Sequence, residues 1–136
     1  MRAEGGKIKG NGGRIETSGR SLEINDIKIS TKSNIGVDGQ WLIDPYDITI
    51  RNNSGSHSDI NGSYTATGNN AVVDVGTLET ALASNNVTVF TGNSGFQNGD
   101  ITVEDAISSN SSNDLTLDSQ GAVSYTHLTL PTSPKV

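Results

Sequence analysis

The sequence contains no cysteine, is only 4% aromatic, and has an apolar share of 32% over 136 residues. The lack of cysteine excludes disulfides, thiolate metal sites and cysteine nucleophiles. So small an apolar share disfavours a thick globular core and favours a thin, layered architecture. Long exported proteins often lack cysteine, because an early disulfide would block their passage across a membrane. The composition is therefore consistent with export.

No apolar run approaches the roughly 20 residues that a membrane-spanning helix needs, so membrane insertion is not expected. The N-terminal segment 1–6 lacks the apolar core of a signal peptide, which places any export signal elsewhere. Charge is unevenly distributed: residues 1–32 carry seven basic and four acidic groups, whereas residues 33–136 carry two and eleven. The acidic body repels nucleic acid, and the basic start has no aromatic residue to stack on bases. No nucleic-acid partner is expected.

Apolar residues recur in short alternating clusters that predict strands two to four residues long. Four of the clusters have the form apolar-threonine-apolar, with the threonine facing outward: Ile48–Ile50, Val87–Val89, Ile101–Val103 and Leu115–Leu117. A spacing of seven residues connects another series: Ile8, Ile15, Leu22 and Ile29. Glycines interrupt this series, and it lacks the second apolar position of a coiled coil, so a helix is not expected there.

A strand-and-turn unit of about seven residues, with three units in a coil of about 20, is typical of stacked β-coils. The sequence therefore predicts an all-β fold, a right-handed parallel β-helix (β-solenoid) that is incomplete at both ends. The alternative is an antiparallel β-sandwich, which short, evenly spaced strands fit less well. Two segments depart from the pattern. The Asn-, Ser-, Gly- and Thr-rich composition of residues 51–70 predicts a loop insertion. In Thr77–Ala83 two leucines four residues apart follow a possible threonine cap, which predicts a short helix.

Three stretches carry a family resemblance: GNGGRIETSG at 10–19, LEI at 22–24 and QWLIDPYDITI at 40–50. Together they resemble the filamentous haemagglutinin and high-molecular-weight adhesin family, whose members combine a glycine-rich stretch with a tryptophan-leucine-leucine-aspartate-proline stretch. The resemblance covers about residues 5–121. Arg14 departs from it by occupying a position where an aromatic is usual, and the amino-terminal secretion module with its asparagine-proline motifs is missing.

The resemblance implies a shaft segment of a large secreted or surface-displayed bacterial adhesin of the two-partner secretion type. It implies export through an outer-membrane β-barrel transporter that recognises a module outside this sequence. It also implies that the parent protein binds a receptor or glycan on a host or neighbouring cell. Two alternatives remain: the shaft of a contact-dependent toxin of the same secretion family, and a carbohydrate-binding or carbohydrate-cleaving β-helix. Acidic side chains clustered on one exposed face would favour the second.

The resemblance also sets the expected domain boundaries, with residues 1–121 as the shaft fragment. Residues 122–136 are predicted to be a non-native tail, because VSYTHLTLPT at 123–132 resembles the translation of a transposon-based sequencing adapter. Neither His127 nor Pro131 is therefore expected to have a functional role.

No enzyme, cofactor or resident metal is expected. Asp44 and Asp47 bracket Pro45-Tyr46, and Glu104-Asp105 follow a strand, but neither pair has a basic partner nearby in the sequence. His57 lies in Ser-His-Ser-Asp, whose adjacent residues point to alternate sides and cannot form a catalytic triad among themselves.

Three lesser expectations concern single residues. A weak ion site is expected, if anywhere, at Asp38 or Asp100. Asparagine glycosylation is a hypothesis for Asn52 and Asn61, which begin acceptor sequons in the predicted loop. Trp41, the sole tryptophan, is expected in the core.

Overall fold

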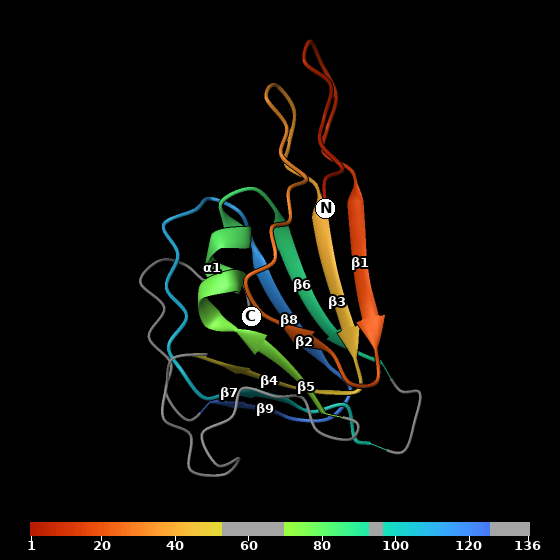
Figure 1. Ribbon diagram of the computed structural model, residues 1–136, viewed down its shortest axis with the longest axis vertical. Coiled ribbons are helices and arrows are strands. Elements are labelled where there is room, and N and C mark those ends of the chain that lie inside the picture. Colours follow the sequence, from red (N-terminus) through yellow and green to blue (C-terminus); the bar gives the residue numbers. More distant parts are fainter. Residues whose placement is uncertain (53–69, 93–96, 126–136) are drawn as a thin grey trace.

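Alternation of apolar and polar residues organises the chain into short strands (Figure 1). The computed structural model describes residues 1–52, 70–92 and 97–125. Within these residues there are nine strands and one helix: β1 (Arg14–Gly19), β2 (Glu23–Ile24), β3 (Gln40–Pro45), β4 (Asp47–Arg51), β5 (Asn70–Asp74), α1 (Val75–Leu82), β6 (Asn86–Thr91), β7 (Ile101–Val103), β8 (Leu115–Ser119) and β9 (Val123–Tyr125).

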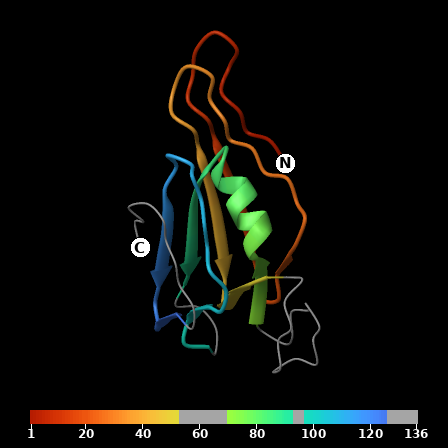
Figure 2. The same cartoon turned by 90° about the vertical axis from the view of Figure 1, so that its left-hand side faces the viewer.

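The strands form two sheets in which every pairing is parallel (Figures 1 and 2). The first sheet has the order β1-β3-β6-β8, and the second has the order β2-β5-β4-β7-β9. Because every pairing among the described strands is parallel, the alternative of an antiparallel sandwich is also wrong for this part of the chain.

The predicted right-handed parallel β-helix is wrong. The described residues form two separate parallel sheets and one helix, with no closed or solenoid sheet, and this arrangement is mixed α/β rather than all-β. In a solenoid each coil stacks on the previous one, so strand order must follow the chain in every sheet. The first sheet meets this condition, but in the second β5 lies between β2 and β4. Alternation in the sequence predicts a strand without specifying its neighbours.

Residues in register across the strands form apolar rows that build the core. One row of the first sheet contains Ile15, Trp41, Val87 and Leu115. The threonines of the apolar-threonine-apolar triplets also align, Thr49 with Thr102 and Thr88 with Thr116. Trp41 is fully buried, as predicted, and its indole Nε1 donates to Thr17 Oγ1 at 3.1 Å.

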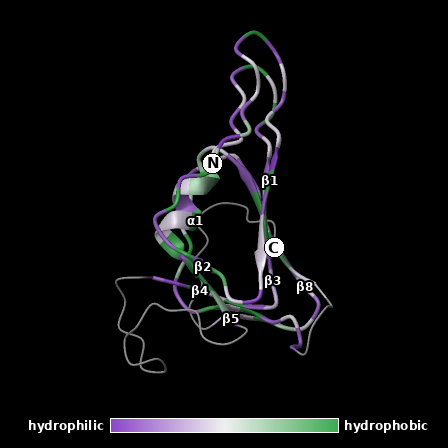
Figure 3. Ribbon diagram, turned by 45° about the vertical axis from the view of Figure 1, so that its right-hand side comes forward, coloured by the Kyte–Doolittle hydropathy of each residue, from purple (hydrophilic) through white to green (hydrophobic). Residues whose placement is uncertain are grey.

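Helix α1 covers a third side of this core, which neither sheet covers (Figure 3). It buries Leu78, Ala81 and Leu82 against the sheets. The short helix was predicted, but its start was not: Asp74 is the N-cap, and Thr77 lies inside the first turn, where its backbone N–H donates to Asp74 Oδ2 at 2.8 Å. Asp74 thus satisfies a helix-end donor that would otherwise lack a partner.

Asn85, just after α1, joins the helix to the segment that follows β2. Its side chain is fully buried. Its Oδ1 accepts from the backbone N and the Oγ1 of Thr31, both at 2.7 Å, and its Nδ2 donates to Ile29 O at 3.0 Å and to Ala81 O. One amide therefore fixes the position of an irregular segment against the helix.

The loop predicted at 51–70 is shorter than expected, because its first and last residues belong to strands. Arg51 is the last residue of β4 and is fully buried, in register with Asp74 and 4.0 Å from Glu104 Oε2. Asn70 likewise belongs to β5. The remaining loop residues, 53–69, lie outside the described part of the chain.

Candidate binding surface

Two loops, one before β1 and one before β3, project beyond the starts of these strands and lie side by side (Figures 1 and 2). We call residues 4–12 and 32–38 together the arm. Backbone bonds join the loops, from Gly5 N to Lys32 O at 2.9 Å and from Gly12 N to Val37 O at 3.0 Å. The arm is therefore one unit in which the two loops are hydrogen-bonded to each other.

The arm displays large apolar side chains to solvent. Ile8 is 84% exposed, Ile35 66% and Val37 67%. Lys7 and Lys9 flank Ile8 and are also exposed. Single exposed apolar residues are ordinary, but three on two bonded loops that project from the body are typical of a contact surface.

The loops have fixed shapes because polar side chains bond their turns. Ser33 Oγ donates to Gly10 O at 2.6 Å and accepts from Gly36 N at 2.7 Å. Asn11 Oδ1 accepts from Val37 N at 3.1 Å. A tip held in this way loses less conformational entropy when it binds a partner.

Glycine is required where the arm joins the body. A Cβ on Gly12 would overlap the carbonyl oxygen of Thr31, and a Cβ on Gly39 would overlap that of Gly13. The glycine-rich stretch near the N-terminus thus permits close approach of two backbones. It does not build a regular coil, and the predicted strand around Ile8 is absent from the structure.

Asp38 and Asp100, the predicted ion positions, hold the backbone and neighbouring side chains. Asp38 Oδ1 accepts from Ser33 N at 2.8 Å, and its Oδ2 accepts from Asn113 Nδ2 at 2.9 Å. Asp100 Oδ1 accepts from Ala122 N at 2.8 Å. The two aspartates lie apart, since Asp38 is the last residue of the arm and Asp100 lies between β6 of the first sheet and β7 of the second.

The carboxylate pairs that bracket strand ends are also used structurally. Asp47 Oδ1 accepts from Gly99 N and Asp100 N, both at 2.9 Å, and Asp105 Oδ2 accepts from Asn52 N at 2.7 Å. Within the residues the structure describes, no three His, Asp or Glu side chains come together in a way that could hold a metal ion.

Asp44 differs from these because its ionisation opposes folding. Burial raises the pKa of its carboxyl above the usual 3.8, a hydrogen bond from the Gly92 backbone lowers this pKa, and the nearby charge of Glu16 raises it again. The folded state thus holds the Asp44 proton more tightly than the unfolded state does. Stability from this group is present at low pH and is lost as pH rises from 3.8 through the raised pKa.

We therefore expect Asp44→Asn to gain stability relative to the parent protein as pH increases through this interval. Thermal unfolding followed by circular dichroism between about pH 3 and neutral pH measures the difference. Glu16→Gln serves as a partial control: it should reduce the pH dependence, because it removes the charge that raises the pKa of Asp44. Parallel curves for Asp44→Asn and the parent protein would contradict the assignment.

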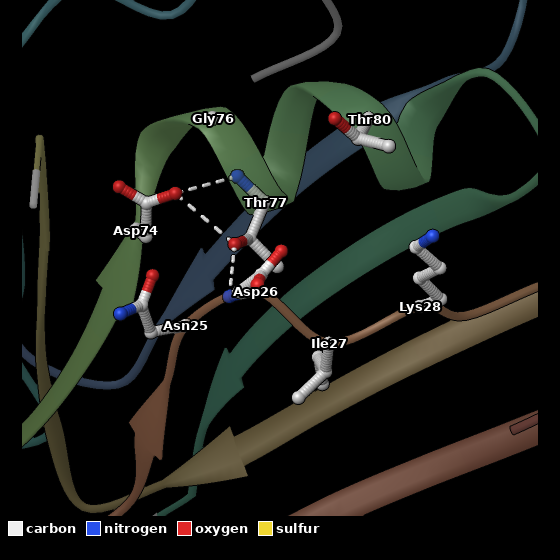
Figure 4. A pocket seen from close by; sticks show the side chains of 8 residues that line it. All are labelled: Asn25, Asp26, Ile27, Lys28, Asp74, Gly76, Thr77 and Thr80. Carbon is white, nitrogen blue, oxygen red and sulfur yellow. Dashed lines mark hydrogen bonds between the residues drawn. The ribbon is translucent and has the colours of Figure 1, made fainter.

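A hollow of about 470 Å³ lies at the start of α1 (Figure 4). Thr77 Oγ1 donates to Asp74 Oδ2 at 3.0 Å and accepts from Asp26 N at 2.8 Å, and Lys28 also lines the hollow. Asp26 adopts a left-handed φ of 52°. Because Asp74 already occupies the helix N-terminus with its own carboxylate, an anionic ligand would be repelled there. The hollow is therefore explained by the N-terminal cap of α1 and is not proposed as a ligand site.

The remaining residues singled out in the sequence lie at the boundary of the described part of the chain or outside it. Asn52 is exposed just after β4, and its glycosylation stays a hypothesis. Asn61, His57, His127 and Pro131 lie outside the described residues. Val123–Tyr125, from the predicted non-native tail, pair with β7.

A scan of the chain against protein-family models finds no match, and searches of curated proteins and of solved structures find none either. Among the described residues, no helix has the length and apolarity needed to cross a membrane. The resemblance to the haemagglutinin family accordingly stays a prediction.

Proposed function

We propose that this chain is a non-enzymatic structural segment of a large secreted or surface-displayed bacterial adhesin, and that its arm contacts the receptor or glycan on the opposing cell. The observation that carries the proposal is the arm, with Ile8, Ile35 and Val37 exposed on two loops of fixed shape. The sequence resemblance supports the class of protein.

The body is built like a support. Its apolar residues belong to rows in register across parallel strands, and these rows pack with α1 into one core cluster. The acidic side chains that could suggest catalysis instead accept bonds from the backbone of adjacent turns, as Asp47 and Asp100 do. Such an arrangement is suited to holding a surface in place.

Export and partners belong to the same proposal. The absence of cysteine suits passage through an outer-membrane transporter. Recognition by that transporter would use a secretion module outside this sequence. A contact-dependent toxin would use the same route, but no described residue favours it over the adhesin.

The arm can be tested by adhesion. Beads coated with the full chain are applied to monolayers of cultured epithelial cells and to slides carrying defined glycans. The variant Ile8→Ser/Ile35→Ser/Val37→Ser is expected to bind at least about tenfold less, which corresponds to roughly 1.4 kcal/mol of contact energy. Its melting temperature should stay close to that of the parent protein, because all three side chains are exposed.

Leu42→Ser is the matched control. Leu42 is half-buried on β3, away from the arm tips, so this variant should bind like the parent protein. The arm assignment fails if the triple variant and the parent protein bind equally well. The adhesin proposal fails if beads carrying the parent protein bind no better than albumin-coated beads on every surface.

A further inference from the structure

Each loop of the arm carries an isoleucine where the loop turns back. Ile8 is the middle residue of the bend at 7–9, and Ile35 is the middle residue of the bend at 34–36. Figure 3 shows hydrophobic positions at the far ends of both loops. Val37 follows on the second loop and is exposed as well. The part of the molecule that projects furthest from the core is therefore apolar.

Two lysines flank this apolar apex. Lys7 and Lys9 are the only charged residues in the stretches 5–12 and 33–37. Both are exposed, and neither forms an ion pair within the described part of the chain. The apex of the arm thus combines exposed apolar area with two available positive charges.

The acidic residues of the arm lie where it joins the body. Glu4 is its first residue, with a carboxylate 3.9 Å from the guanidinium of Arg2. Asp38 is its last residue, and both of its carboxylate oxygens accept hydrogen bonds. The arm extends from the body along the longest axis of the molecule (Figure 1). The charges nearest the apex are therefore the two lysines, not the acidic groups of the body.

We infer that the arm inserts its apex into the headgroup region of an anionic phospholipid bilayer. The inference rests on the proposed function, because it specifies what the arm contacts on the opposing cell. Ile8, Ile35 and Val37 enter the boundary between headgroups and acyl chains, where apolar side chains beside basic ones bind. Lys7 and Lys9 extend their long side chains to the lipid phosphates. Such shallow insertion requires no segment that crosses the membrane.

The composition of the arm favours a lipid surface over a protein receptor. Protein interfaces are enriched in tyrosine, tryptophan and arginine, which carry most of their affinity, and are depleted in lysine. Residues 4–12 and 32–38 contain three lysines, no aromatic residue and no arginine. Binding to an anionic bilayer requires only apolar area and positive charge, which is what the apex presents.

The test is flotation of the full chain with unilamellar vesicles of phosphatidylcholine, alone or with about 30% phosphatidylserine. Lipid is varied up to about 1 mM, roughly ten times the concentration at which a single myristoyl chain is half bound. The parent protein is expected to bind the anionic vesicles, and to bind the neutral ones at least about fivefold more weakly, because the lysines gain nothing there.

Lys7→Gln/Lys9→Gln is expected to bind the anionic vesicles at least about tenfold less than the parent protein, since each lysine contributes about fivefold. Arg20→Gln/Lys28→Gln is the matched control. It removes two exposed positive charges outside the arm, one just after β1 and one after β2, and should retain most of the binding.

The apolar side of the contact is tested by the same triple serine variant at positions 8, 35 and 37. This variant should bind at least about tenfold less, because it removes the side chains that enter the bilayer. Ile8→Leu keeps an apolar side chain at the apex and should bind like the parent protein. Circular dichroism melts identify any variant that has lost its fold.

The inference is overturned if the parent protein floats with neither kind of vesicle, or if the triple serine variant binds as well as the parent. It is also overturned if the arm lysine variant and its control lose binding equally. The adhesin proposal fails separately. Beads that bind cells while the chain ignores vesicles would overturn the lipid inference alone and leave a protein or glycan receptor. A chain that binds vesicles while its beads bind no cell would support the lipid inference and overturn the adhesin proposal.

Discussion

Asn85→Ala is expected to lower the free energy of unfolding by about 3 to 5 kcal/mol, because it leaves buried polar groups without partners at roughly 1 to 3 kcal/mol each. The Thr31 N–H and the Ile29 carbonyl both lose the amide that satisfies them, at a site closed to water. The hydrogen bond from Asp26 N to Thr77 Oγ1 would remain as a polar link between this segment and α1.

Urea unfolding followed by circular dichroism, at a fixed low protein concentration, measures the change. Asn34→Ala is the matched control: it makes the same substitution at an exposed position of the arm and should cost less than about 0.5 kcal/mol. An Asn85 variant as stable as this control would show that the buried amide is not essential to the fold.

Trp41→Ala is expected to cost a similar amount, about 3 to 5 kcal/mol, through lost burial and the cavity that remains. Trp41 lies in the middle of the first sheet between Ile15 and Val87, and it has no exposed surface. Thr17 would also lose the indole that donates to its hydroxyl.

The same unfolding measurement applies to Trp41→Ala, with Phe90→Ala as its control. Phe90 is an aromatic residue of the neighbouring strand β6, but it is only half-buried, so its removal should cost less than half as much. Equal costs for the two variants would contradict the central role assigned to Trp41.

The sequence predicted local structure well because local structure depends on residues close together in the chain. The triplets at 48–50, 87–89, 101–103 and 115–117 all lie in strands, with their threonines less buried than the apolar residues of the three inner strands. The helix near residue 78 was also correct to within a turn. Alternation and capping act over a few residues, so a pattern over the same distance reveals them.

Strand order was not predictable in this way. The position of β5 between β2 and β4 depends on which apolar faces meet across long connections, and the triplets look alike from one strand to the next. Spacing alone suggested that Ile8 continues the series of Ile15 and Leu22. The structure instead exposes Ile8 at the tip of the arm, because glycines on both sides let the backbone turn outward before the sheet begins.

The candidate site was missed for the same reason. The sequence placed functional interest on aspartates and on loop asparagines, and it assigned the apolar residues to the core. The lysines beside Ile8 were no signal, because Ile15 also lies between two charged residues and packs against the core. The glycines on both sides of Ile8 were the available signal, because clustered glycines mark turns. Arg51 gave no signal of its burial, because Asp74 and Glu104, which lie beside it in the fold, are more than 20 residues further along the chain.

The arm gives each chain one contact surface, so the strength of attachment under the proposed function would depend on how many chains a cell displays. Once one arm is bound, the next binds at a high effective concentration, so contacts that are individually weak could together produce firm attachment.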